Sequence, residues 1–182
     1  MRRRGIEPRF VDGRRVTDLP SLACVRTALA DVSDALVTAI EATGATGVAL
    51  RHGQVIAADR VAALGLVGEP RAVALEQVRE ILVAGAIPVL APLGRDRDGR
   101  YLNVNADDVA AAVAVAIAAD ELLFLSDVAG VLDGAGTVLA TISASAPPTV
   151  TGGMVPKLAA CAAALAGGVS RVRIGVGTAV TV

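Results

Sequence analysis

The sequence predicts an α/β fold, a three-layer αβα arrangement in which helices cover an open, mostly parallel sheet. Stretches with helical periodicity alternate with short aliphatic strands, a pattern typical of parallel sheets covered by helices. The chain is 54% hydrophobic but only 2% aromatic, so its core must consist of Ala, Val, Leu and Ile. A polar turn also follows the apolar strand 122–125, at the end of a strand where such sheets bind ligands.

The first helix is predicted over residues 19–43. Thr17 or Asp18 can cap it, Pro20 suits its first turn, and Gly44 can end it. Its apolar residues recur every three or four positions, so we expect them on one face. They are Leu22, Val25, Leu29, Val32, Leu36 and Ile40.

The remaining elements alternate between strands and helices. Two short apolar runs, 48–50 and 55–57, flank a polar turn and predict a hairpin. The later elements, in chain order, are a helix over 76–83, a strand over 87–91, a charged loop over 94–100, a helix ending near Ala119, the strand 122–125, a helix after Gly152-Gly153 that ends at Gly167, and strands over 171–174 and 178–182.

Composition excludes several classes of protein. Lys and Arg total 17 and Asp and Glu 18, which lacks the basic excess of nucleic-acid-binding or membrane-surface proteins. The Ala/Val run 109–119 is shorter than the ~20 apolar residues of a membrane span. Cys24 and Cys161 lie in apolar surroundings without disulfide or metal spacing, which fits a reducing, cytoplasmic setting. His52 is the only histidine, so neither a Ser-His-Asp site nor a histidine metal cluster is expected.

Polar residues gather where the third helix begins. Asn105 can cap that helix, and Asp107 and Asp108 suit its first turn, where the helix dipole favours negative charge. Asn103 lies two residues before Asn105, so the two side chains point the same way in an extended segment. The group can therefore serve either as a structural cap or as a binding site for a carboxylate or a charged partner.

The last helix has an unusual start. Gly152 and Gly153 precede it, Pro156 suits its first position, and Lys157 follows at once, against the helix dipole. Backbone N–H groups and an ammonium there could form a phosphate cradle. An exposed lysine on a helix is the alternative.

The turn Ser126-Asp127-Val128-Ala129-Gly130 ends a strand as nucleotide-binding turns do, but a turn of this kind is weak evidence by itself. Neither a GxGxxG nor a GxxxxGK[ST] motif occurs in the sequence.

These segments, in this order, resemble the amino acid kinase family, and within it the acetylglutamate kinases. The resemblance runs through nearly the whole chain. The matching segments are Gly5-Ile6-Glu7-Pro8-Arg9-Phe10, Asp12-Gly13-Arg14-Arg15-Val16-Thr17-Asp18, Leu64-Gly65-Leu66-Val67-Gly68-Glu69, Ile87-Pro88-Val89, Asn103-Val104-Asn105-Ala106-Asp107, Leu125-Ser126-Asp127-Val128-Ala129-Gly130-Val131-Leu132 and Gly152-Gly153-Met154-Val155-Pro156-Lys157.

The resemblance implies transfer of the ATP γ-phosphoryl group to the side-chain carboxylate of N-acetyl-L-glutamate, a step of arginine synthesis, with Mg²⁺ on the phosphates and no metal site of the protein's own. Arg15, Asn103 and Asn105 would bind the acylated amino acid. Asp107 would orient the catalytic lysines of the family pattern. Lys157 would stabilise charge on the phosphoryl group in flight. The nucleotide would lie against Ser126, Asp127, Val128, Gly130, Val131, Leu132, Gly152 and Gly153.

The chain also departs from the family pattern. It starts after the positions of the family's Lys-x-Gly-Gly strand and its Gly-rich His-Gly-Gly-Gly loop, and Ile174 runs directly into Gly175 where the family has another helix. We therefore expect an N-terminally truncated fold, with residues 1–120 as a partial acyl-substrate lobe and 121–182 as a shortened nucleotide lobe.

Three functional hypotheses remain open at this point. The first is an acetylglutamate kinase whose turnover from these residues is very weak or absent. The second is a non-catalytic domain of the same fold, which binds nucleotide or pairs with another subunit. The third is a sister kinase acting on an aminoadipate derivative. The resemblance also implies a homo-oligomer.

Overall fold

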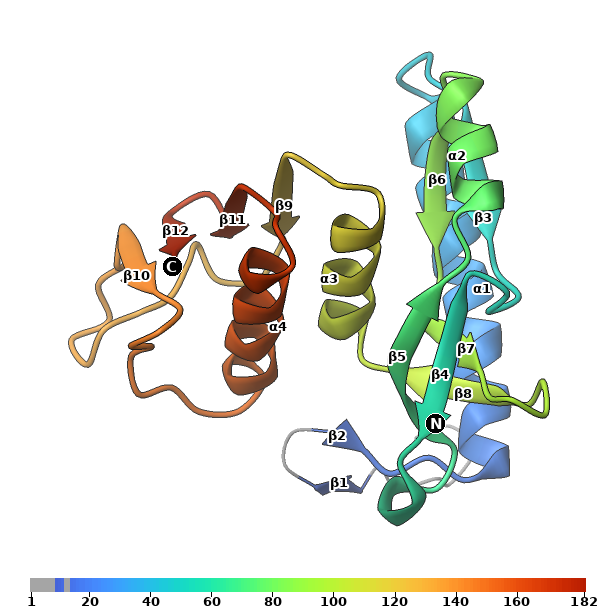
Figure 1. Cartoon of the computed structure of the whole chain (residues 1–182), viewed down its shortest axis with the longest axis horizontal. Coiled ribbons are helices and arrows are strands. Elements are labelled where there is room, and N and C mark those ends of the chain that lie inside the picture. The colour runs from blue at the N-terminus through green and yellow to red at the C-terminus, as the bar shows by residue number, and fades with distance from the viewer. Residues whose placement is uncertain (1–8, 12–13) are drawn as a thin grey trace. The chain divides into compact units, whose positions relative to one another are not determined.

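The computed structural model describes residues 9–11 and 14–182, so segment 5–8, Asp12, Gly13 and the basic run 2–4 lie outside the described residues. The chain divides into two compact units, Met1–Ala106 and Asp107–Val182 (Figure 1). Each unit has its own strands and helices and is described by itself.

The first unit contains two larger helices and a small barrel. Strands β4, β5, β8 and β7 close into the barrel, while β3 pairs in parallel with β6 and β1 pairs antiparallel with β2. The elements are β1 (Phe10–Val11), β2 (Arg14–Arg15), α1 (Leu19–Glu41), β3 (Gly47–Leu50), β4 (Ile56–Arg60), the 3₁₀ helix η2 (Ala62–Leu64), β5 (Val67–Val73), α2 (Glu76–Val83), β6 (Ile87–Leu90), β7 (Leu93–Arg95) and β8 (Tyr101–Val104).

The second unit has a four-stranded sheet in the order β10-β12-β11-β9. The pairs β10–β12 and β11–β9 are parallel, and β11–β12 is antiparallel. Its elements are α3 (Ala106–Ala116, which starts at the last residue of the first unit), β9 (Glu121–Phe124), β10 (Thr141–Ser143), α4 (Met154–Ala166), β11 (Arg171–Ile174) and β12 (Thr178–Thr181).

The predicted α/β class, with helices alternating with parallel strand pairs, is confirmed. The predicted ranges of α2, α4 and β11 are also confirmed, because in each case glycine or a cap marks the boundary in the sequence. Of the helices in the described ranges, none is both long and apolar enough to cross a membrane.

The predicted buried face of α1 is only partly right. Asp18 caps the helix by accepting the backbone N–H of Ser21 at 2.8 Å, as expected. Val32 and Leu36, however, are 54% and 49% exposed, while Ser33 is only 3% exposed. At about 100° per residue, Ser33 (i+11) lies about 20° from Leu22 around the helix, whereas Val32 (i+10) lies about 80° from it. Ser33 is tolerated inside because its hydroxyl donates to the Leu29 carbonyl at 2.8 Å.

The hairpin predicted from residues 48–50 and 55–57 is wrong. Strand β3 instead pairs in parallel with β6, with Val48 opposite Pro88, and β4 pairs antiparallel with β5. The two runs therefore belong to different sheets. Local turn residues could not reveal this, because the partner of β3 lies beyond β4 and β5 in the chain, and β4 pairs with the strand that follows it.

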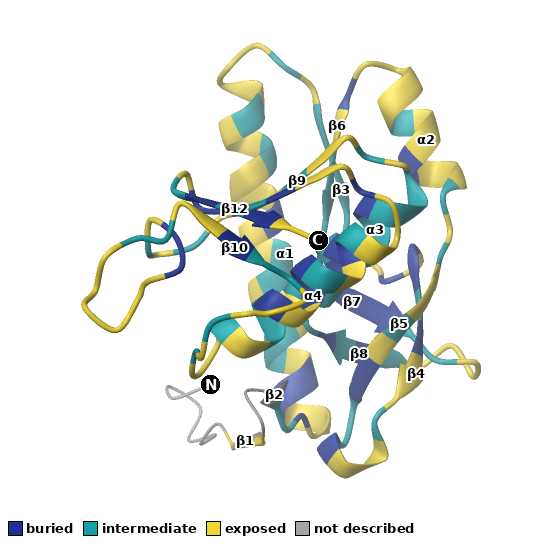
Figure 2. Cartoon of the chain, turned by 60° about the vertical axis from the view of Figure 1, so that its left-hand side comes forward, coloured by how far each residue is buried: buried dark blue, intermediate teal, exposed yellow. Residues whose placement is uncertain are grey.

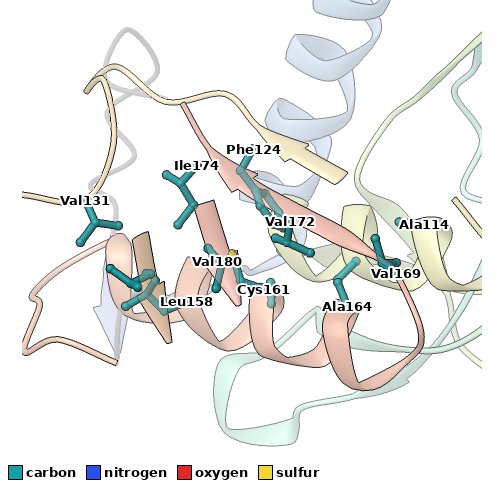
Figure 3. Close-up of a cluster of buried hydrophobic side chains, with 13 residues drawn as sticks. Ala114, Phe124, Val131, Leu158, Cys161, Ala164, Val169, Val172, Ile174 and Val180 are labelled. Atoms are coloured by element: carbon teal, nitrogen blue, oxygen red, sulfur yellow. The ribbon is translucent and has the colours of Figure 1, made fainter. Parts of the chain in front are cut away.

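The core of the second unit lies between its sheet and helices α3 and α4. Cys161, Ala164 and Leu158 of α4 point toward Val172 and other aliphatic side chains of the strands (Figure 3). At the end of α4, a Cβ on Gly167 would lie 2.4 Å from a methyl of Val115 in α3, so only glycine allows this approach of the two helices. Figure 2 shows the alternation of buried and exposed residues along the elements.

We predict that the buried thiol of Cys161 makes stability pH-dependent. Burial raises the pKa of Cys161 from 9.0 to about 12, so folding favours the protonated thiol. That contribution is complete below pH 9.0 and is lost as the pH rises from there toward about 12. Urea unfolding of the wild type and Cys161→Ala should therefore show a stability difference that shrinks above that pH.

A stability difference that stays constant over this range would contradict the prediction. As a control, the half-exposed Cys24 should react with a thiol reagent in the folded protein, whereas Cys161 should react only after unfolding.

Candidate functional site

The strongest polar contact of the second unit joins the starts of its two helices. Lys157 Nζ donates to Asp107 Oδ1 at 2.6 Å. The two side chains are only 13% and 21% exposed, so water screens the ion pair far less than it would on an open surface.

Helix geometry explains why both residues are tolerated there. Asp107 lies in the first turn of α3, where the helix dipole favours a carboxylate. Lys157 lies in the first turn of α4, where the dipole disfavours a cation. The Asp107 carboxylate offsets this cost and holds the ammonium at the start of α4. Pro156 occupies the third helical position rather than the predicted first one, which is still a position whose N–H has no acceptor within the helix.

An aromatic ring completes this group of residues. Lys157 Nζ lies 5.0 Å from the ring centroid of Phe124, the last residue of β9. The Phe124 residue is only 4% exposed. A cation over a desolvated ring face is attracted to it. Phe124 was not among the residues predicted from the sequence, although it is one of only two phenylalanines in the chain and lies two residues before the polar turn.

A second sequence signal was also missed. Lys157 is the only lysine of the chain, and every other residue in its total of 17 Lys and Arg is an arginine. Arginine serves ordinary surface charge throughout this sequence, so a single lysine indicates a position that needs a compact ammonium.

Glycines before α4 leave its start open. A Cβ on Gly152 or Gly153 would meet nothing within 4 Å, and both residues are exposed. Gly152 has φ +62, a conformation that side chains rarely adopt. Unobstructed backbone at a helix start can receive an anion.

The predicted nucleotide turn begins at Ser126, two residues after Phe124. Ser126 is half-buried and its hydroxyl bonds to Asp127 Oδ1 at 3.2 Å, while Asp127 itself is exposed. Val128 is half-buried and Leu132 is 42% exposed. Gly130 and Val131 are buried instead, and the Val131 N–H is bound by Thr178. The turn thus has an exposed first part and a fixed last part.

In the first unit, one buried threonine joins two of the predicted substrate residues. Thr17 is 0% exposed; its Oγ1 donates to the Arg15 carbonyl at 3.1 Å and accepts from Asn103 Nδ2 at 3.2 Å. Because the only hydroxyl proton goes to Arg15, Thr17 must accept from the Asn103 amide, which fixes the orientation of that amide. Gly65 allows the close packing, since a Cβ there would lie 2.4 Å from the Thr17 carbonyl oxygen.

The structure thus gathers the predicted residues into two groups, each within its own unit. Arg15 and Asn103 are linked through Thr17, and Asn105 is half-buried at the residue before α3. Asp107 and Lys157 form the ion pair of the second unit. Among the described residues, no three His, Cys, Asp or Glu side chains are arranged to hold a metal ion.

We predict that the Lys157–Asp107 pair stabilises the second unit. Asp107→Asn leaves a largely buried ammonium without its carboxylate and should lower the free energy of unfolding by about 1–3 kcal/mol. Adding Lys157→Met to this variant should recover part of the loss, because the unpaired charge is then removed. Urea unfolding of the two single variants and the double variant measures this coupling.

The matched control is Glu121→Gln. Glu121 pairs with Arg171 at 3.7 Å and Arg173 at 3.6 Å on an exposed surface, so its loss should cost under about 1 kcal/mol. Equal effects of Asp107→Asn and Glu121→Gln would refute the special role of the pair.

The chain has many relatives among curated proteins. Acetylglutamate kinase from Chlorobium luteolum is 37% identical, covering 93% of this chain and 59% of that protein. Acetylglutamate kinase from Methanopyrus kandleri is 40% identical, covering 92% of this chain and 76% of that protein. The chain therefore spans 59% of the length of the first relative and 76% of the second.

Solved structures also match the fold of this chain. The structure of smu.665 from Streptococcus mutans matches with a TM-score of 0.93 and 33% identity, covering 100% of this chain and 80% of that one. N-acetylglutamate synthase from Neisseria gonorrhoeae, complexed with coenzyme A and N-acetyl-glutamate, matches with a TM-score of 0.87 and 26% identity, over 48% of its own chain. A model of the amino acid kinase family matches residues 1–175, and the chain belongs to this family.

Proposed function

We propose that this chain carries the ATP site and the acyl-amino-acid site of a kinase that phosphorylates the side-chain carboxylate of N-acetyl-L-glutamate. The observation that carries the proposal is the Lys157–Asp107 pair, a single ammonium held at 2.6 Å by a carboxylate at the start of two helices. The acetylglutamate kinases among the relatives support the choice of substrate.

The reaction suits a site without histidine. A carboxylate oxygen of the substrate attacks the γ-phosphorus of ATP, the bond to the bridging oxygen breaks, and ADP leaves with that electron pair. The attacking carboxylate is ionised at neutral pH and needs no general base. Positioning and charge neutralisation supply the catalysis, and Lys157 would supply positive charge as charge shifts among the phosphoryl oxygens.

Mg²⁺ would enter with ATP as part of the substrate. Mg²⁺ keeps several waters and commonly binds through substrate phosphates rather than through a protein cage.

The acyl substrate would bind to the first unit. We propose that the Arg15 guanidinium holds a carboxylate of N-acetyl-L-glutamate and that Asn103 and Asn105 bind polar groups of the same molecule. The link through Thr17 supports a fixed Asn103 amide. In this proposal residues 1–120 form the acyl-substrate lobe.

The nucleotide would bind to residues 121–182. We propose that Ser126, Asp127, Val128 and the following residues of the turn line the nucleotide site, with Gly152 and Gly153 near its phosphates. Their open backbone supports that role.

A non-catalytic domain is the second candidate function, and one observation favours it. The family resemblance implies two phosphate-stabilising lysines, whereas this sequence contains one. Loss of one such group costs on the order of 10²–10³ in rate. We therefore expect acetylglutamate-dependent ADP release from these 182 residues to be very weak or absent, while nucleotide binding remains.

Two further properties belong to the same proposal. We infer a homo-oligomer in the cytoplasm, as expected for an enzyme of amino-acid biosynthesis that handles ATP. A sister activity on an aminoadipate derivative remains an alternative for the acyl site, and the test below separates it.

Calorimetric titration with MgATP tests the nucleotide site. Wild type should bind MgATP, and Lys157→Met should weaken binding about ten- to a hundredfold, because a charge-assisted hydrogen bond is lost. Lys157→Arg is the matched control that keeps the charge but not the geometry. Unchanged affinity in Lys157→Met would refute the assignment of Lys157.

Substrate choice is tested separately by titration with N-acetyl-L-glutamate and with N-acetyl-L-aminoadipate. We expect tighter binding of N-acetyl-L-glutamate and its loss in Arg15→Met, because the carboxylate then lacks its guanidinium partner. Preference for the longer acid would favour the sister activity. Family-like ADP release that Lys157→Ala abolishes would show that the expectation of weak turnover is wrong.

A further inference from the structure

The segment Gly175-Val176-Gly177 connects β11 to β12, and Thr178, the partner of the Val131 N–H, is the first residue of β12. The segment lies against the predicted nucleotide turn. The backbone N–H of Gly175 donates to the Phe124 carbonyl at 2.8 Å, and that of Gly177 donates to the Ala129 carbonyl at 2.9 Å. The connection is thus hydrogen-bonded to two points of the segment 124–129.

The packing of the two backbones requires glycine. A Cβ on Gly175 would lie 2.3 Å from the Ala129 carbonyl oxygen, and one on Gly177 would lie 2.9 Å from it. Gly175 also has φ +57, which favours glycine for a second reason. The connection can therefore approach the turn only because these side chains are absent.

Thr178, directly after this segment, makes the most specific contact with the turn. It is 1% exposed, and its Oγ1 accepts the backbone N–H of Val131 at 2.9 Å and donates to the Leu139 carbonyl at 2.7 Å. A Cβ on Gly130 would lie 2.3 Å from Thr178 Oγ1. Gly130 is therefore the residue whose missing side chain lets the hydroxyl reach Val131.

The same hydroxyl could simply satisfy a strand end, as many buried threonines do. Its partners indicate more than that, because the bond to Val131 spans 47 residues and reaches the turn itself. The Val131 carbonyl is fixed as well, by the backbone N–H of Leu139 at 2.8 Å. Thr178 therefore completes a frame that holds Gly130 and Val131 in one conformation.

We propose that Thr178 is a positioning residue for the nucleotide site, which fixes the last part of the turn 126–132 so that its exposed first part can receive ATP. This inference rests on the proposed function, since it takes the turn to be the nucleotide-binding segment.

The test compares three single variants by calorimetric titration with MgATP. Thr178→Val keeps the branched shape and removes both hydrogen bonds, whereas Thr178→Ser keeps the hydroxyl. Ser33→Ala is the control: it removes a buried hydroxyl of α1 that, among the contacts described, bonds only to the Leu29 carbonyl. We expect Thr178→Val to weaken MgATP binding about tenfold, as for loss of a buried hydrogen bond, and the other two to stay near wild type. Recovery of affinity in Thr178→Ser is a result that general destabilisation would not give.

Amide hydrogen exchange of Val131, measured without ligand, keeps the inference distinct from the proposed function. Thr178→Val and Gly130→Ala should both speed exchange of this amide, and Gly130→Ala serves if the first variant does not fold. Faster exchange with unchanged MgATP affinity would overturn the inference and leave the proposed function intact. A wild-type protein that binds no MgATP while Thr178 still protects Val131 would overturn the proposed function, and the nucleotide role of Thr178 with it.

Discussion

The second unit depends on one ion pair between the starts of two helices. The dipole of α4 disfavours the Lys157 ammonium in the first turn of that helix. The dipole of α3 favours the Asp107 carboxylate, which lies 2.6 Å from the ammonium and offsets this cost. The contact requires α3 and α4 to lie close together, which Gly167 permits at the other end of α4. The packing of α3 against α4 therefore also fixes where the Lys157 ammonium lies.

In each unit, a buried hydroxyl group holds one of the predicted site residues in place. Thr17 holds Asn103 in the first unit, and Thr178 holds Val131 in the second. In both places a glycine, Gly65 or Gly130, leaves room for the approach. Val131 lies outside the helices and strands, so the bond from Thr178 in β12 fixes it instead.

Much of the fold could be predicted from the sequence because its signals are local. Glycines marked the ends of α2 and α4, and polar residues at helix starts drew attention to Asp107 and Lys157. Long-range pairing was not predictable, as strand β3 shows, since its pairing with β6 is decided by packing. Phe124 and Thr178 were missed for the same reason, because apolar and small residues carry no chemical signal until their neighbours are known.

Lysine-selective ¹³C labelling provides the most direct test of the central claim, because the chain has one lysine and gives one Cε–Hε correlation. If Asp107 holds Lys157 for phosphate binding, this signal should differ from that of an unfolded chain, move in Asp107→Asn, and move again when MgATP saturates the wild type. A signal that matches the unfolded chain and stays unchanged under both conditions would contradict the account.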